Sequence, residues 1–174
     1  MLLGQRGLNV IGQPVYGPVS PYEPESAAFQ RTRHVRPLTL DKNLPLYEGF
    51  DYGKHHPCVV WAQYTPWAEL RLLGGLLGQD LYLEDFIPLV QHYRRLGFAE
   101  ALEVLAWCDP AGSHDNAQGV RQNGVSLLQD HGIYPSFRLD SNTPDVRVGV
   151  IERIAATMRR RSARGEAFAV DDPH

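Results

Sequence analysis

The stretch Leu46–Gln63, LYEGFDYGKHHPCVVWAQ, constrains the fold more than any other part of the chain. It predicts a strand that ends on the carboxylate of Asp51, then a tight turn at Gly53, and then a second, apolar strand. A lone aspartate at the end of a strand and before a glycine turn is suited to holding a cation. The arrangement recurs at Val104–Gly112, VLAWCDPAG, where an apolar run ends on Asp109. We therefore expect Asp51 and Asp109 to lie side by side at the edge of one sheet and to bind divalent metal.

Each aspartate also has a simpler structural interpretation. Asp51 could cap the turn at Gly53, and Asp109 could form an Asx turn ahead of Pro110. Taken singly, either aspartate is more often a turn residue than a metal ligand. The metal hypothesis depends on the fold bringing the two together.

Length and composition indicate one globular domain without a membrane anchor. The chain has 174 residues, of which 43% are hydrophobic and 21% are charged. No apolar run approaches the roughly 20 residues that a membrane-spanning helix needs. The beginning, MLLGQRGLNVIGQPV, has no basic leader followed by a continuous apolar segment, so we expect no signal peptide. The two cysteines, Cys58 and Cys108, are not spaced as a metal-binding pair, and the chain is predicted to be cytoplasmic.

Charge is distributed unevenly along the chain. The net charge of −3 argues against a generally basic nucleic-acid coat. Residues 46–144 carry 6 basic and 12 acidic side chains, whereas residues 145–164 carry six arginines and two acids. An acidic centre beside a basic helix fits a metal site that acts on a polyanion. A solvated helix face explains the arginines equally well.

The chain divides into an N-terminal arm and a regular domain. Residues 1–43 are rich in glycine and proline and are expected to form an irregular arm or linker, with a possible edge strand between Phe29 and Leu40. Residues 44–174 are expected to form the domain. Its predicted strands are Leu46–Tyr52, Pro57–Tyr64, Glu69–Leu77, Val104–Cys108, Ile133–Leu139 and one from Glu166 onward. Its predicted helices are Leu83–Leu96, Gly119–His131 and a third that Thr143 caps and Pro144 begins.

The order of these elements predicts an α/β fold. Short links join the first three strands, which should form an antiparallel meander. Val104–Cys108 is a continuous apolar run that follows a helix, so we expect a strand buried on both faces and parallel to its neighbour. Three antiparallel strands followed by parallel strands, with helices on both faces, match a ribonuclease H-like mixed sheet. In that topology the first strand is central, and Asp51 and Asp109 become neighbours.

A pair of carboxylates at such a position could share two Mg²⁺ or Mn²⁺ ions roughly 3.5–4 Å apart and support hydrolysis of a phosphodiester. Oxygen ligands favour these ions over Zn²⁺. Five basic residues are candidates for contacts to DNA: Lys54, His55, Arg147, Arg159 and Arg160. Each of them could equally be a solvated or locally paired surface residue.

Three segments together resemble a known family: GFDYGKHHPCVVWAQ, WCDPAG and GIYPSFRLDSNTPDVRVGVIERI. They look like the C-terminal nuclease domain of the large terminase subunit of tailed bacteriophages. The resemblance implies a metal-dependent DNA endonuclease that cleaves concatemeric viral DNA during packaging in the host cytoplasm, with Asp51 and Asp109 as catalytic metal ligands. It further implies double-stranded DNA, an ATPase domain, the small terminase subunit and the portal as partners.

The chain departs from the family pattern in one respect. The family's third acid lies further along than the sequence reaches, so the nuclease domain looks truncated at its C-terminal end. Asp171 and Asp172 are more naturally part of a surface turn. Two alternatives therefore stay open: a catalytically silent ribonuclease H-like module that docks onto the packaging motor, and a resolvase-like nuclease that prefers branched DNA.

Overall fold

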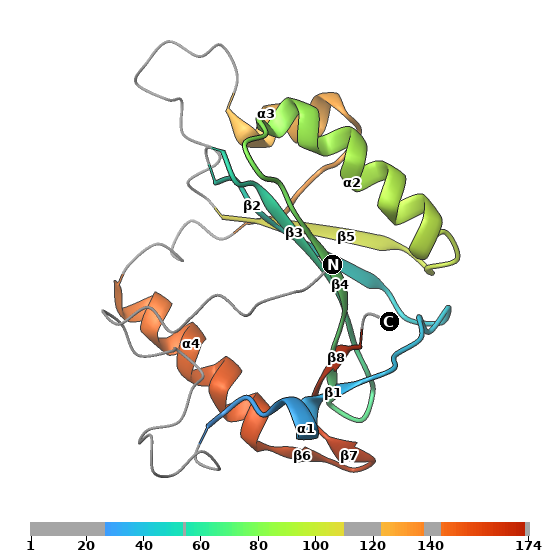
Figure 1. The fold of residues 1–174 in the computed structure, drawn as a ribbon, viewed down its shortest axis with the longest axis vertical. Coiled ribbons are helices and arrows are strands. Elements are labelled where there is room, and N and C mark those ends of the chain that lie inside the picture. Colours follow the sequence, from blue (N-terminus) through green and yellow to red (C-terminus); the bar gives the residue numbers. More distant parts are fainter. Residues whose placement is uncertain (1–26, 54, 110–122, 138–143, 173–174) are drawn as a thin grey trace.

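A mixed β-sheet forms the centre of the computed structural model, which describes residues 27–53, 55–109, 123–137 and 144–172 (Figure 1). Within these residues the sheet has six strands in the order β1-β8-β4-β3-β2-β5. The strands are β1 (Val35–Arg36), β2 (Leu46–Asp51), β3 (Cys58–Tyr64), β4 (Leu70–Leu77), β5 (Val104–Cys108) and β8 (Phe168–Asp171), while β6 (Arg161–Ser162) and β7 (Gly165–Glu166) form a separate hairpin. The helices are α1 (Arg31–His34), α2 (Leu83–Gly97), α3 (Gly124–Asp130) and α4 (Pro144–Arg159).

The predicted antiparallel meander is confirmed. β2 pairs antiparallel with β3, and β3 pairs antiparallel with β4. β5 then pairs with β2 in parallel, as expected for a strand that follows a helix. The resulting order of β4, β3, β2 and β5 is the one that a ribonuclease H-like sheet requires, with β2 in its interior.

β5 is less buried than its apolar sequence predicts. Val104 is 37% exposed and Trp107 is 45% exposed, and Ala106 is the buried residue of the strand. The prediction of burial on both faces was wrong because β5 is the last strand of the described sheet. Beyond it, Ser136 alone pairs with Trp107 as an isolated parallel bridge.

The segment that contains Ser136 was predicted to be a full strand, Ile133–Leu139. Within the described residues it makes two backbone hydrogen bonds to β5, from Cys108 N to Ser136 O at 3.0 Å and from Ser136 N to Ala106 O at 2.8 Å. Pro135 precedes this bridge and has no N–H to extend the pairing. Residues 138–139 lie outside the described part of the chain.

The N-terminal segment joins the opposite edge of the sheet. β1 pairs in parallel with β8, so the edge strand expected between Phe29 and Leu40 is present. The buried ring of His34 fixes α1 beside α4, because its Nε2 lies 2.8 Å from the carbonyl oxygen of Met158. Residues 1–26 of the predicted arm lie outside the described residues.

Helices cover both faces of the sheet, as predicted. On one face α2 and α3 bury Phe86, Ile87, Val90 and Leu128 against Leu46, Phe50, Val59 and Trp61. On the other face α4 packs Met158 and Ile154 against Phe168 and Leu70. Figure 1 shows α4 separated from α2 and α3 by the sheet. No helix in the described part of the chain is long and apolar enough to cross a bilayer.

The caps of the last two helices are only partly within the described residues. Asn123 caps α3, since its side-chain oxygen accepts a hydrogen bond from Ser126 N at 2.8 Å. This helix was predicted to begin at Gly119, and residues 119–122 lie outside the described part of the chain, as does Thr143, the predicted cap of α4.

A close contact between α3 and the end of β2 gives a test of the packing. A Cβ atom at Gly124 would lie 2.6 Å from the Tyr52 ring, whereas one at Gly97 would meet nothing within 4 Å. We expect Gly124→Ala to lower the free energy of unfolding by about 1–3 kcal/mol, because the ring would have to shift. Gly97→Ala is the matched control and should be neutral or stabilising by up to about 1 kcal/mol. Urea unfolding of both variants checks this, and equal effects would contradict the packing.

Candidate functional site

The two predicted metal ligands lie at neighbouring strand ends. Asp51 is the last residue of β2, and Asp109 directly follows β5. The parallel register pairs Phe50 with Cys108, so the next position on each strand is an aspartate. Adjacent strands are about 4.8 Å apart, which places the two residues side by side.

Alternation along β2 decides which face carries Asp51. Leu46, Glu48 and Phe50 are buried, while Gly49 and Asp51 are exposed. Because side chains alternate along a strand, Asp51 lies on the face opposite α2 and α3. No ion pair to Asp51 is formed by the described residues, so its carboxylate faces solvent.

Three titratable groups adjoin the aspartates along the strands, with Tyr52 and Cys108 on the helix-covered face. Burial raises the pKa of the Cys58 thiol, and the carboxylate of Asp51 raises it further. Burial also raises the pKa of the Cys108 thiol, with the charge of Asp109 adding to this against an opposing effect of Tyr52. The pKa of the Tyr52 phenol is raised by burial and then by Cys108 and Asp109. The thiols and the phenol therefore stay uncharged at neutral pH.

The donor set fits a hard divalent cation. Mg²⁺ is commonly held by one or two carboxylates, with water and substrate phosphate oxygens completing its shell. Among the described residues no group of three or more His, Cys, Asp or Glu side chains could enclose a metal ion. Asp51 and Asp109 offer carboxylate oxygens, a donor chemistry that matches Mg²⁺ or Mn²⁺ rather than Zn²⁺.

The candidate DNA contacts that the structure describes do not gather at one place. His55 is exposed in the turn after β2, where its ring lies 5.4 Å from that of Tyr82. Lys54 is outside the described residues, and Arg147 lies in α4 with its side chain outside the described part. His55 is therefore the described candidate that follows Asp51 closely in the chain.

Arg159 and Arg160 lie at the far end of the sheet. The carbonyl of Arg160 accepts a hydrogen bond from Ala167 N, next to the start of β8. Phe168 of β8 pairs with Leu70, at the end of β4 opposite to the one that reaches Asp51. The structure does not bring these two arginines to the carboxylate pair.

A buried carboxylate beneath the site was not predicted from the sequence. Glu48 is fully buried in β2 and accepts hydrogen bonds from Trp61 Nε1 at 2.8 Å and from Arg94 Nη1 at 3.2 Å. Arg94 belongs to α2, so this contact joins the helix to the strand that carries Asp51. The available signal was the alternation in LYEGFD, which places Glu48 on the buried side with Leu46 and Phe50.

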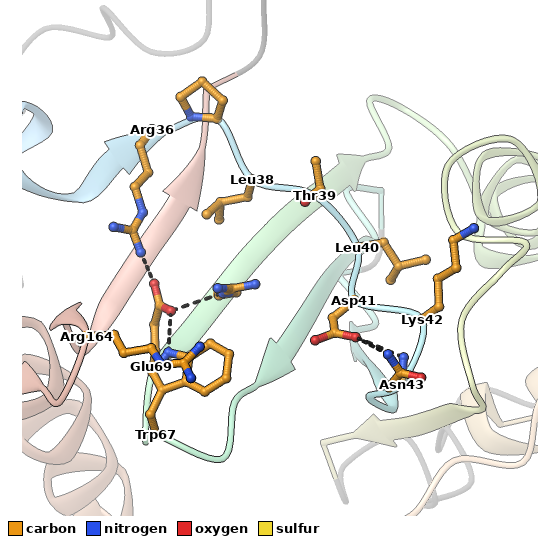
Figure 2. A pocket seen from close by; sticks show the side chains of 12 residues that line it. Arg36, Leu38, Thr39, Leu40, Asp41, Lys42, Asn43, Trp67, Glu69 and Arg164 are labelled. Atoms are coloured by element: carbon orange, nitrogen blue, oxygen red, sulfur yellow. Dashed lines mark hydrogen bonds and ion pairs between the residues drawn. The ribbon is translucent and has the colours of Figure 1, made fainter.

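A second buried carboxylate was also not predicted from the sequence. The buried carboxylate of Glu69, at the opposite end of the sheet, holds Arg36, Arg71 and Trp67 beside a cavity of about 730 Å³ (Figure 2). The local pattern WAELR places Trp67, Glu69 and Arg71 two residues apart, as side chains on one face of a strand would be. The contribution of Arg36 comes from a distant segment and has no such signal.

Comparison with known proteins supports the fold. No protein-family profile and no curated protein sequence matches the chain. The structure is similar to that of the large terminase from a thermophilic bacteriophage, at a TM-score of 0.55 and 13% identity, over 83% of this chain and 33% of that one. It is also similar to the large terminase nuclease domain of bacteriophage SPP1, described with bound Mn, at a TM-score of 0.49 and 14% identity, over 80% of this chain and 70% of that one.

The likeness of fold rests on the thermophilic phage terminase. The chain spans about a third of that protein, and together with the strand order this confirms the predicted resemblance at the level of fold. The fold is therefore a ribonuclease H-like mixed sheet, similar to part of that large terminase.

The buried position of Glu48 predicts how stability depends on pH. Burial outweighs the hydrogen bonds from Trp61 and Arg94 and raises the pKa of Glu48 above its usual 4.5. The folded protein then binds this proton more tightly than the unfolded chain does. The Glu48 contribution to stability is therefore greatest below pH 4.5 and decreases as the pH rises from there through the folded-state pKa.

We expect Glu48→Gln to remove this decrease. One proton accounts for a slope of at most about 1.4 kcal/mol per pH unit. Urea unfolding between pH 4 and 7 should show the slope in the wild type and in Glu103→Gln, a control at an exposed carboxylate, and should show a flatter profile for Glu48→Gln. Identical profiles in all three proteins would contradict the assignment.

Proposed function

We propose that this chain is a metal-dependent DNA endonuclease domain of a phage large terminase, which cleaves concatemeric viral DNA during packaging. The observation that carries the proposal is the parallel register that sets Asp51 beside Asp109 at one edge of a ribonuclease H-like sheet. The fold likeness to the thermophilic phage terminase supports the same class. The buried contact of Glu48 with Arg94 holds β2 against α2 and so keeps Asp51 in place.

The chemistry proposed for the site is hydrolysis of a phosphodiester with two Mg²⁺ or Mn²⁺ ions. Bound divalent ions lower the pKa of an attacking water and stabilise the leaving oxygen. Asp51 and Asp109 would hold the ions from two rigid strand ends, and His55 would lie in the turn beside the scissile strand. Water, DNA phosphate oxygens and groups beyond the described residues would complete the metal shells.

The partners follow from the same proposal. Double-stranded DNA would be held through its backbone, with Lys54, His55, Arg147, Arg159 and Arg160 as the candidate contacts. An ATPase domain, the small terminase subunit and the portal would be the protein partners in the host cytoplasm. Because this chain spans a third of the thermophilic phage terminase, cleavage in a complete packaging motor would depend on further parts of the assembly.

One observation favours a second candidate, a catalytically silent docking module. No third acidic residue joins Asp51 and Asp109 within the described part of the chain. The same face exposes apolar side chains, among them Val60 at 40% and Trp107 at 45%. A folded protein that neither binds Mn²⁺ at the aspartates nor nicks DNA would favour this candidate.

Substitution of the aspartates tests the proposed nuclease. We expect Asp51→Asn and Asp109→Asn each to reduce nicking of supercoiled plasmid in Mn²⁺ by roughly 100-fold or more, since loss of a direct ligand should exceed the 10–100-fold cost of outer-shell changes. Glu103→Gln is the matched control, because this exposed carboxylate lies at the other end of β5 and should leave the rate unchanged.

Metal binding gives the corresponding equilibrium test. Calorimetric titration with Mn²⁺ should show binding to the wild type and to Glu103→Gln, and much weaker binding to either aspartate variant. Unchanged nicking and unchanged Mn²⁺ affinity in Asp51→Asn would rule out the proposed site. A preference for branched DNA over linear duplex would instead indicate a resolvase-like nuclease.

A further inference from the structure

The cavity beside Glu69 lies at the end of the sheet away from the aspartates. It has a volume of about 730 Å³, is open to solvent, and is lined by residues 36–43, by the β3–β4 turn with the start of β4, and by Arg164 of the β6–β7 turn (Figure 2). Tyr64 and Leu70 pair beside this turn, whereas Asp51 pairs with Cys58 at the opposite end of β3. The cavity is therefore separate from the candidate metal site.

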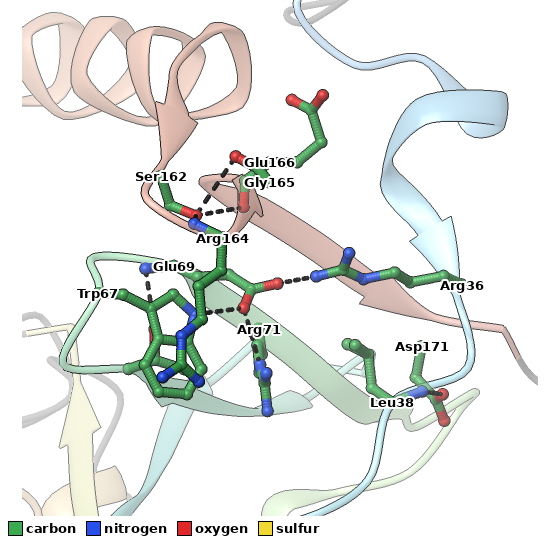
Figure 3. A network of polar contacts seen from close by, with 11 residues as sticks. Arg36, Leu38, Trp67, Glu69, Arg71, Ser162, Arg164, Gly165, Glu166 and Asp171 are labelled. Carbon is green, nitrogen blue, oxygen red and sulfur yellow. Dashed lines mark hydrogen bonds and ion pairs between the residues drawn. The ribbon is translucent and has the colours of Figure 1, made fainter.

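The carboxylate of Glu69 organises the polar wall of this cavity (Figure 3). Its side chain is 3% exposed and accepts hydrogen bonds from Trp67 Nε1 and Arg71 Nε, both at 3.1 Å. Its other oxygen accepts from Arg36 Nη2. Both guanidinium groups are thus fixed by one buried carboxylate rather than left to move as surface side chains do.

The fixed arginines keep hydrogen-bond donors for a ligand. Among the described residues, the two η nitrogens of Arg71 have no hydrogen-bond acceptor, although its side chain is only 19% exposed. Arg36 uses one η nitrogen on Glu69 and is 43% exposed. A guanidinium has five N–H donors in a planar fork, so both groups, which line the cavity, keep donors that Glu69 does not use.

The third arginine adds charge that no described carboxylate neutralises. Arg164 stacks over the Trp67 ring, with its Cζ 4.2 Å from the ring centroid. Set against the carboxylates of Glu69 and Asp41, the three guanidinium groups that line the cavity leave one positive charge. Lys42 pairs with Glu100 at 2.7 Å and so adds no net charge, whereas the hydrogen bonds to Asp41 come from the neutral Asn43 and offset none of its charge.

We propose that this cavity is a binding site for a phosphate monoester group. Arginine forks match the oxygen geometry of phosphate, and a monoester carries nearly two negative charges at neutral pH. A terminal phosphate offers three acceptor oxygens to these forks, whereas a phosphodiester offers two. The volume lies in the range of small-molecule sites, so a terminal phosphate with an attached nucleoside fits.

The phosphate has three possible sources, which share the same chemistry. They are inorganic phosphate, a free mononucleotide and the 5′-phosphorylated end of a DNA strand. The site contains none of the residues proposed to bind metal. Phosphate binding can therefore be measured in EDTA, without metal. Absence of phosphate binding would contradict the phosphate site and leave the proposed nuclease untouched.

The test is a calorimetric titration of the 174-residue chain in EDTA at fixed ionic strength. The probes are inorganic phosphate, dAMP and a short DNA duplex with either a 5′-phosphate or a 5′-hydroxyl. Arg164→Ala removes the exposed arginine without uncovering Glu69, and Arg71→Lys keeps the charge beside Glu69 but removes the fork. Arg95→Ala is the matched control, at an exposed arginine near the end of α2 that does not line the cavity.

The proposal predicts binding of at least one monoester probe by the wild type and by Arg95→Ala. Affinity should be at least about tenfold lower in Arg164→Ala and in Arg71→Lys, with unfolding midpoints of Arg164→Ala and the control alike. A preference for the 5′-phosphorylated over the 5′-hydroxyl duplex identifies a DNA end as the source. No binding of any monoester, equal affinity in all variants, or equal binding of both duplexes without binding of phosphate or dAMP would overturn the proposal.

Discussion

The parallel pairing of β2 with β5 determines where the groups of the candidate site lie. Its register matches Phe50 with Cys108 and therefore places an aspartate at the next position of both strands. A slip of one residue would move every side chain of a strand to the opposite face of the sheet. Asp51 would then point toward α2 and α3 instead of toward solvent, and the two carboxylates would not meet.

Buried contacts on the other face of β2 hold this register. Glu48 joins the strand to Trp61 of β3 and to Arg94 of α2, and the Tyr52 ring fills the space that Gly124 leaves open. Removing either contact would weaken the packing beneath the site while leaving the two aspartates in the sequence. The stability of the sheet and the geometry of the proposed metal site are therefore coupled through the two faces of one strand.

Much of the fold was predictable because it depends on local pattern. The alternation in β2, the short links of the meander and the helical spacing of α2 all lie within a few residues of one another. The side-by-side placement of Asp51 and Asp109 followed from element order alone. The exposure of Trp107 was not predictable, because an apolar run does not reveal that its strand lies at the edge of a sheet.

The buried carboxylates were missed for a related reason. Glu48 pairs with Arg94, and the two are separated by 46 positions in the chain. Glu69 pairs with Arg36, at a separation of 33 positions. Charged side chains are almost never fully buried unless they are paired, and sequence pattern alone does not show a distant partner. The outcome is a molecule with carboxylates at one end of its sheet and an excess of arginine charge at the other, as separate sites for a cation and an anion require.

A crystal of the chain soaked in Mn²⁺ would test the central claim most directly, through the anomalous scattering of the metal. The account predicts an anomalous peak in contact with carboxylate oxygens of both Asp51 and Asp109. A peak that contacts neither aspartate, or carboxylates too far apart to share an ion, would contradict it.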